Sequence, residues 1–309
     1  MTVIEKLLIQ LLKIESYSGQ EKKLADFVIK KLPKFKIKKQ FVSKNRFNII
    51  AKKGKSTIWL VCHLDTVKGK VPLKVFSDRI QGRGACDNKG NLAGLLMAAN
   101  QLPDVNVLLT VGEEDNFIGV KKAASVISNG KFIVLEATDF KIITQQRGII
   151  TGIIETTGKE SHSSLGAENS AIHYLIDRLG GLKEKNWPLF NIGLIEGGLA
   201  ENIVASRASA TFTIRPKTNE ESKAILKSLK DAKITIKNNV SPFVSSLQKK
   251  INEFNLVSFF SEMAFFENSI LFGAGKAQQM HSKDEFILKQ DLNQLSERLV
   301  ELVKKVGSL

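Results

Sequence analysis

The sequence predicts an α/β protein in which a smaller α+β domain is inserted. Residues 1–146 alternate helical patterns with short apolar runs, which are typical of buried strands in a sheet covered by helices. From 147 to 240 the order becomes strand, helix, strand, strand, helix, strand, which is the split βαβ pattern of ferredoxin-like domains. Residues 241–309 read as α/β again, so we expect them to complete the first domain.

Each element is predicted from the spacing of its apolar residues. Helical spacing occurs in VIEKLLIQLLKI (3–14), NLAGLLMAANQL (91–102) and DLNQLSERLVELVKKV (291–306). Another helix is expected after SGQE, where Ser18 and Glu21 fit a capping box. Apolar strand candidates are TIWLVC (57–62), VNVLLTV (105–111) and FIVL (132–135). The inserted domain is expected to contain strands at 148–158, 191–195, 203–214 and 233–237, with helices at 168–182 and from 219.

Composition limits the class of protein. The chain has 309 residues and a formal charge of +15, from 46 Lys and Arg against 31 Asp and Glu, and only eight of these cations are Arg. The densest basic stretch, KKLPKFKIKK at 30–39, is interpreted as a helix end and an exposed strand, so we expect a solvated surface and no nucleic-acid binding. The excess positive charge would still attract an anionic substrate or an acidic protein partner.

The expected location is the cytoplasm, without membrane association. No apolar stretch approaches the ~20 residues of a membrane span, and acids and lysines stand where a signal peptide would have its apolar core. The cysteines, Cys62 and Cys86, fit a reducing compartment without structural disulfides.

Acidic and histidine side chains follow several candidate strands. In an open α/β sheet, ligands bind beyond the carboxyl ends of the strands, so these residues would converge on one rim. They occur in CHLDT (His63, Asp65), GRGACDNKGN (Asp87), GEED (Glu113, Glu114) and LEATD (Glu136, Asp139), while MHSKDEF adds His281.

The residue types indicate a catalytic metal site. His63 and Asp65 leave a strand on the same face, so the imidazole would bind a cation while the carboxylate orients it. Carboxylates and histidines without thiolates suit zinc, manganese or cobalt, and so many carboxylates on one rim argue for two ions. Taken singly, the HxD triplet could be structural, Asp87 a helix cap, GEED a solvated turn and His281 a surface residue.

Together these segments resemble a known family. CHLDTV, GRGACDNKG, GEED, LEATD, GKESHSS, ENIVASRASATFTIR and HSKDEF are similar, in order, to the motifs of the co-catalytic metallopeptidases, which include acetylornithine deacetylase, succinyl-diaminopimelate desuccinylase, aminoacylase and glutamate carboxypeptidase. The resemblance spans about residues 5–305. It implies a zinc-aminopeptidase-like catalytic domain with an inserted ferredoxin-like lid domain through which two chains would form a homodimer.

The resemblance also implies roles for individual residues. His63, Asp87 and Glu136 would hold one metal ion, and the bridging Asp87, Glu114 and His281 the other. Glu113 would be the general base, with Asp65 as the partner of His63. From the lid, His162 would stabilise the oxyanion, in its own or the partner subunit, while Asn202 and Arg215 would hold the substrate carboxylate. Gly275 would contact substrate. The two ions are expected to be zinc, with cobalt or manganese as alternatives.

Some positions depart from the family pattern. GAG stands at 273–275 where GPG is usual, Glu262 replaces an aspartate, and NIVAS replaces NIVPA. The chain is also shorter than typical members. These departures surround the substrate pockets, so they leave the acyl group and the amino acid open.

The function expected from this resemblance is hydrolysis of the amide bond of an N-acyl amino acid. The nearest branch is that of arginine and lysine biosynthesis, including a variant that releases lysine or ornithine from an acidic carrier protein. A dipeptidase or carboxypeptidase of the same family is the alternative, and a metal-binding homologue without turnover is the alternative from another class.

Overall fold

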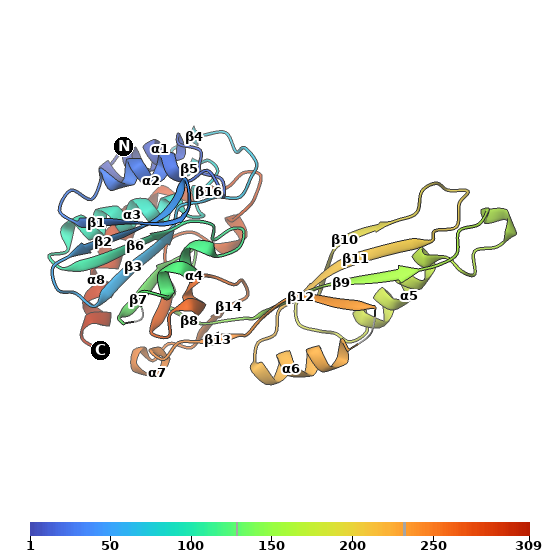
Figure 1. Cartoon of the computed structure of the whole chain (residues 1–309). Helices are drawn as coiled ribbons and strands as arrows, with labels where there is room; N and C mark the ends of the chain where they lie inside the picture. Colours follow the sequence, from blue (N-terminus) through green and yellow to red (C-terminus); the bar gives the residue numbers. More distant parts are fainter. Residues whose placement is uncertain (128, 231–232) are drawn as a thin grey trace. The chain divides into compact units, whose positions relative to one another are not determined.

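The computed structural model describes residues 1–127, 129–230 and 233–309 of the chain (Figure 1). It divides into two compact units. The larger unit contains residues 1–144, 244–255 and 261–309, and the smaller unit contains residues 145–243 and 256–260.

A mixed sheet forms the centre of the larger unit. Its four neighbouring inner strands, β6, β3, β7 and β15, are parallel, so their carboxyl ends meet at one edge, which we call the carboxyl rim. In sheet order the strands are β1 (Lys36–Ser43), β2 (Arg46–Lys53), β6 (Val105–Thr110), β3 (Ile58–His63), β7 (Lys131–Leu135), β15 (Ser269–Phe272), β8 (Ile143–Gln146) and β13 (Phe243–Val244), while β14 (Asn255–Val257) pairs with β8.

Helices cover this sheet, as the apolar runs predicted. Strands β3 and β6 are buried along their whole length, and Leu8, Leu92 and Leu299 from three helices pack into one core with them. The helices are α1 (Val3–Leu12), α2 (Lys22–Ile29), α3 (Lys89–Gln101), α4 (Ile118–Ala124), α7 (Gln248–Ile251) and α8 (Lys289–Gly307). Short elements complete the unit: β4 (Lys74–Val75), β5 (Arg79–Gln81), β16 (Phe286–Leu288), η2 (Glu262–Phe265) and η3 (Ala277–Gln279).

The capping box expected before α2 is wrong. Glu21 occupies the N-cap position and makes no side-chain capping hydrogen bond. Its carboxylate instead accepts two hydrogen bonds from the Arg46 guanidinium, at 2.6 and 3.1 Å, and the Ser18 hydroxyl donates to Asp65 at 2.7 Å. The same carboxylate accepts the Gly19 backbone N–H at 2.9 Å, but the helix begins only at Lys22, so Ser18 is too far from its first turn to be the cap.

The smaller unit has the predicted ferredoxin-like order. Its antiparallel sheet runs β10 (Asn191–Gly197), β11 (Arg207–Ile214), β9 (Ile149–Thr157), β12 (Ile234–Val240). Helices α5 (Ala171–Lys183) and α6 (Asn219–Ser228) contribute Leu175 and Ile225 to a core with the sheet, and η1 (Ser163–Leu165) lies in the loop after β9. The α/β class with an inserted α+β unit is therefore confirmed (Figure 1).

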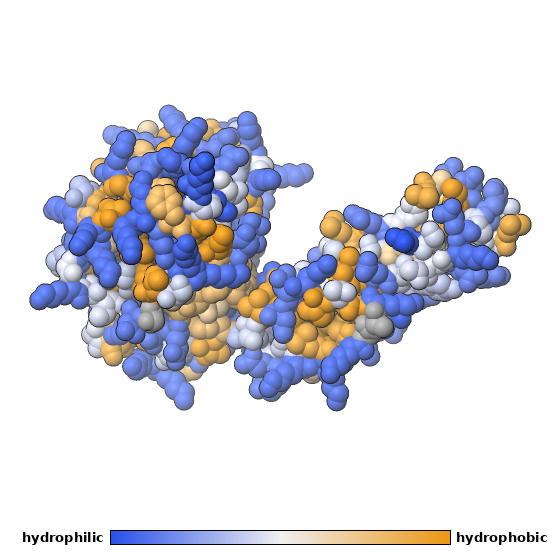
Figure 2. Space-filling model, viewed as in Figure 1, coloured by the Kyte–Doolittle hydropathy of each residue, from blue (hydrophilic) through white to orange (hydrophobic). Residues whose placement is uncertain are grey.

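The surface of the larger unit is predominantly hydrophilic on the face in Figure 2, with single apolar side chains between the charged ones. None of the helices within the described ranges has the length and apolar character needed to span a membrane.

Candidate metal centre

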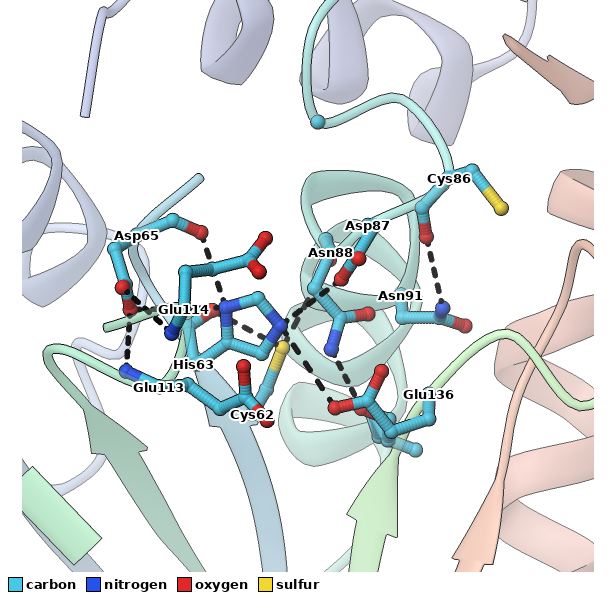
Figure 3. Close-up of polar contacts among 12 residues, drawn as sticks. Cys62, His63, Asp65, Cys86, Asp87, Asn88, Asn91, Glu113, Glu114 and Glu136 are labelled. Atoms are coloured by element: carbon cyan, nitrogen blue, oxygen red, sulfur yellow. Dashed lines mark hydrogen bonds and ion pairs between the residues drawn. The ribbon is translucent and has the colours of Figure 1, made fainter. Parts of the chain in front are cut away.

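The carboxyl rim of the larger unit gathers His63, Asp87, Glu114 and Glu136, which are predicted to bind metal (Figure 3). His63 is the last residue of β3, Glu136 follows β7 directly, and Glu113 and Glu114 follow β6 after a short turn. Asp87 comes from the loop before α3. Parallel neighbouring strands account for this convergence, because each strand delivers its following residues to the same edge.

Asp87 lies between two histidines. Its Oδ1 is 3.0 Å from His63 Nε2, and its Oδ2 is 3.1 Å from His281 Nε2. Glu136 Oε1 is 3.8 Å from His63 Nε2, and Glu114 Oε2 is 2.9 Å from His281 Nε2. Asp87 therefore presents one oxygen to each side of the centre.

Burial of several acids at one place is electrostatically costly. Burial raises the pKa of Glu113 and of Glu136 well above the usual range, and neighbouring carboxylates add to the shift. Burial opposes the charged form of His63, but hydrogen bonds to Asp65 and Asp87 raise its pKa well above normal. Hydrogen bonds to Asp87 and Glu114 raise the pKa of His281 to about 10. In this arrangement the two histidines supply the positive charge that the acids require.

Divalent cations would serve the same purpose and fit these residues. Ligand atoms of His63, Asp87 and Glu114 all lie within 4.8 Å of one another. Glu114 Oε1 is buried and accepts no hydrogen bond from the described residues, so it has an unused lone pair at the centre. Oxygen and imidazole donors suit zinc, cobalt or manganese. His281 is 49% exposed and His63 only 1%, so the centre is open to solvent on the His281 side.

Asp65 orients the site in a different way from the one its sequence spacing suggests. The Nδ1 atom of His63 lies 3.0 Å from the main-chain carbonyl oxygen of Asp65, while the nearest carboxylate oxygen is 3.7 Å away. A ring N–H at Nδ1 donates to this carbonyl. In the metal-free protein a proton on Nε2 donates to Asp87, and after loss of that proton the same nitrogen would offer its lone pair to a metal ion.

The Asp65 carboxylate holds the GEED turn. It accepts backbone N–H groups from Gly112 (3.0 Å), Glu113 (3.1 Å) and Glu114 (3.1 Å). Gly112 has a φ of +76°, and a Cβ there would lie 2.8 Å from an Arg46 nitrogen, so the turn requires glycine. Because only their backbone is held, the side chains of Glu113 and Glu114 can both extend to the carboxyl rim.

Glu285 holds the backbone of the Asp87 loop, as Asp65 holds the GEED turn. The sequence analysis did not identify this residue. It is fully buried and accepts backbone N–H groups from Gly84 (3.0 Å), Cys86 (3.0 Å) and Asp87 (2.9 Å), besides a 2.8 Å ion pair with Arg83. Its position four residues after His281 is the sequence signal that could have found it. One carboxylate thus ties the loop of Asp87 to the loop of His281.

Further contacts position the Asp87 loop. Asn88, and not Asp87, is the N-cap residue of α3, and Asn91 binds the backbone of both Cys86 and Ala274. Gly275 has a φ of +87°, and a Cβ there would lie 2.6 Å from Cys86 Sγ. Its predicted substrate contact stays a prediction.

The two cysteines of the chain, Cys62 and Cys86, are buried beside the predicted ligands. Burial raises the pKa of the Cys62 and Cys86 thiols, so both cysteines stay protonated beside the predicted ligands.

Glu262, which stands where the family pattern has aspartate, is also buried beneath this site. It is 1% exposed, and neither oxygen accepts a hydrogen bond of normal geometry from the described residues. Burial raises its pKa to about 7, while His63 and the Thr110 hydroxyl partly offset the shift.

The predicted lid residues lie in the smaller unit. His162 and Asn202 are neighbours: Ser163 N–H donates to the Asn202 carbonyl at 3.0 Å, and His162 Nδ1 lies 2.8 Å from Ser164 Oγ. Arg215 follows the other end of β11, about eight residues or ~25 Å away from Arg207. Its buried Nη1 has no hydrogen-bond partner within the described ranges.

Comparisons with known proteins agree with this arrangement. A profile of the peptidase dimerisation domain matches residues 144–236. A peptidase M20 domain-containing protein of Schizosaccharomyces pombe is 32% identical over 232 residues, covering 66% of this chain and 58% of that protein. A probable carboxypeptidase of Aspergillus clavatus is 30% identical over 264 residues, covering 70% and 63%. A LysW-lysine/LysW-ornithine hydrolase of Sulfurisphaera tokodaii is 30% identical over 172 residues, covering 54% and 49%.

The solved structures share the fold over the whole chain. A tripeptidase from Staphylococcus aureus superposes with a TM-score of 0.82 at 20% identity, covering 99% of this chain and 98% of that one. The chain therefore has the fold of these peptidases and contains a segment that matches a peptidase dimerisation domain. In sequence it is similar to members of the M20 peptidase family. Its matched region spans about three fifths of the length of the first two relatives.

Replacing Glu285 tests its hold on the Asp87 loop. We expect Glu285→Gln to lower the free energy of unfolding by about 2 kcal/mol, because buried backbone donors lose a charged acceptor. We also expect zinc affinity to fall by about tenfold or more, because Asp87 loses its support. Urea unfolding and zinc titration against a chromophoric chelator measure both. Glu267→Gln, at an exposed acid of the same unit, is the control, and an unchanged zinc affinity in Glu285→Gln would contradict this role.

The raised pKa of Glu262 predicts that the stability of the metal-free protein depends on pH. Its native pKa of about 7 exceeds the ordinary 4.5, so the native state retains a proton that the unfolded state releases. Its contribution to stability is therefore full below pH 4.5 and is lost as pH rises through 7. Between pH 5 and pH 8 we expect the wild type to lose about 3 kcal/mol relative to Glu262→Gln. Urea unfolding in chelator measures this difference, and parallel curves for the two proteins would refute it.

Proposed function

We propose that this protein is a dinuclear-metal amidohydrolase that cleaves the linear amide bond between an acyl group and an amino acid. The observation that carries the proposal is the placement of Asp87, whose two oxygens lie 3.0 and 3.1 Å from two different histidines. A carboxylate shared in this way could bridge two metal ions. His63 and Glu136 would complete one metal site, and Glu114 and His281 the other.

Two divalent cations held there would polarise the amide carbonyl and lower the pKa of water. The protein's own contribution is proton transfer by Glu113. Its half-buried carboxylate, with a pKa raised by desolvation and by neighbouring acids, is suited to accept a proton from the attacking water. The same group then returns the proton to the leaving nitrogen. Asp65 fixes the backbone of Glu113, which keeps this carboxylate at the rim.

The substrate class proposed is an N-acyl amino acid with a free carboxylate, including lysine or ornithine joined to an acidic carrier protein. The Sulfurisphaera relative is named for hydrolysis of such carrier-linked amino acids. Arg215 offers a buried guanidinium nitrogen without a partner in the described structure, which suits a carboxylate. The Aspergillus relative supports the second candidate, a carboxypeptidase, which cleaves the same kind of bond next to a free carboxylate.

A homodimer formed through the smaller unit is part of the proposal, supported by the match to the peptidase dimerisation domain. His162 and Asn202 lie at one end of β11 and Arg215 at the other, about 25 Å apart. One small substrate cannot contact both groups of a single chain. We therefore infer that His162 and Asn202 serve the partner subunit's site, where His162 would donate a hydrogen bond to the developing oxyanion.

A substrate panel tests the proposed activity. Metal-free protein is loaded with zinc, cobalt or manganese and assayed for amine release from N-acetylornithine, N-succinyl-diaminopimelate, dipeptides and peptides ending in lysine. We expect at least one amide to be hydrolysed only when metal is present. Binding of two ions without hydrolysis of any substrate would favour a metal-binding homologue that lacks turnover.

Substitutions of Glu113 and Glu114 should affect different properties, turnover for Glu113 and zinc binding for Glu114. We expect Glu113→Gln to lower kcat by at least about a thousandfold while two zinc ions still bind, because only the proton acceptor is lost. Glu114→Gln should lower zinc affinity, because it removes a ligand. Turnover and zinc content measured on both variants decide the assignment, and equal loss of zinc in both would reverse it.

Mixing two inactive variants tests whether His162 of one subunit acts in the site of the other subunit. His162→Ala and Glu113→Gln each disable one part of the site, so a mixed dimer regains one complete site. After refolding an equal mixture, we expect about a quarter of wild-type activity, because half of the dimers are mixed and each has one working site. Activity no higher than that of the separate variants would mean that His162 acts in its own subunit.

A further inference from the structure

The positive charge of this chain is concentrated in one short segment. Residues 22–55 contain thirteen Lys and Arg and one Asp, so they carry a net charge of +12 of the chain's +15. The remaining residues are almost balanced in charge. An imbalance of this size in 34 residues requires a more specific explanation than general solubility.

In the structure this segment forms α2, β1 and β2 at one edge of the main sheet. β1 is the terminal strand in the sheet order. The one acid, Asp26, is already paired with Lys22 (2.6 Å) and Lys39 (2.9 Å). Other lysines of the segment are exposed and form no ion pair with any described residue: Lys23, Lys30, Lys34, Lys36, Lys38, Lys44, Lys52 and Lys55. We call this surface the basic face.

The basic face begins at the carboxyl rim. β1 is antiparallel to β2, and β2 is antiparallel to β6, so β1 runs in the same direction as β6. The β1–β2 turn, which contains Lys44, therefore lies at the edge where Glu113 and Glu114 follow β6. From α4, Lys122 donates to the Phe41 carbonyl at 2.6 Å and adds another cation beside this turn. β1 lies three strand spacings, or ~14 Å, from the strand of His63.

We propose that the basic face is the docking site of an acidic protein that delivers the substrate on a flexible acidic arm. This inference rests on the proposed amidohydrolase function and adds the surface that would select the carrier. The charge is complementary to such a partner, and an arm of five or more residues is long enough to reach from β1 to the rim at ~3.3 Å per residue.

A protein fits this surface better than a nucleic acid does. Arg46 is the one arginine of the segment, and Glu21 already binds its guanidinium in two places. Phe47 is buried, and the exposed Phe41 packs against it, with ring centroids 5.3 Å apart. Recognition of nucleic acids relies on free arginines and on aromatic faces for stacking, and the basic face presents compact ammonium groups instead.

The experiment separates docking from catalysis by using two probes. A fluorescein-labelled octaglutamate peptide amide reports binding by anisotropy, without any cleavable carboxyl-terminal residue. Acetyl-octaglutamyl-lysine reports hydrolysis, compared with Nα-acetyl-lysine as a substrate too short to reach the basic face. The variant protein is Lys38→Glu with Lys44→Glu. The matched control is Lys304→Glu with Lys305→Glu, which makes the same charge change at exposed positions near the end of α8.

We expect the Lys38/Lys44 variant to bind octaglutamate about tenfold more weakly and to show a KM for the octaglutamyl substrate about tenfold higher, with kcat unchanged. Hydrolysis of Nα-acetyl-lysine should be unaffected, and the Lys304/Lys305 control should change binding less than about twofold. Equal weakening in both variants, or tighter binding of an oligo-thymidylate than of octaglutamate, would overturn the proposal. If neither substrate is hydrolysed, the proposed function fails, but the binding measurement still decides whether the basic face docks acidic chains.

Discussion

The interaction on which the rest of this structure depends is the mutual repulsion of carboxylates at the carboxyl rim. Parallel strands bring Glu113, Glu114 and Glu136 to one place, and the loop before α3 adds Asp87 there, so like charges raise the free energy of the folded state. His63 and His281 offset part of this cost by contacting Asp87 from two sides. The donor set as a whole suits divalent cations, which would neutralise the remainder. Negative charge that is unfavourable by itself would then become the means of binding metal.

Two further carboxylates, Asp65 and Glu285, make this concentration of charge geometrically possible. Each accepts three backbone N–H groups, so its own charge is stabilised by dipoles and it draws a loop into shape. Asp65 fixes the turn after β6 and Glu285 fixes the loop before α3. These two residues thereby hold the backbone from which Glu113, Glu114 and Asp87 extend. Loss of either anchor would move predicted ligands without removing any of them.

The two units of the chain have different proposed roles. The larger unit contains the candidate metal centre and the basic face, which begins at the same rim, so the proposed substrate capture and chemistry would be linked along one sheet. The smaller unit has a core of its own and matches a dimerisation domain. If Asn202 and Arg215 both bind substrate, as we propose, their separation along β11 would require a second chain, because the two residues could not reach one small substrate from the same copy.

The sequence by itself determined the fold class, the ferredoxin-like order of the inserted segment, and five of the seven strands that it predicted to within two residues, because apolar periodicity is local information. It also identified the histidines and acids that follow the strands, while their roles remain predictions. The tertiary structure alone decided which groups these residues contact. It replaced the Ser18/Glu21 capping box with contacts to Asp65 and Arg46, turned the Asp65 carboxylate toward the GEED turn, and gave Glu285 its place under the Asp87 loop. Partners such as Glu285 and Asp87 are 198 positions apart, and no local pattern encodes a hydrogen bond over that distance.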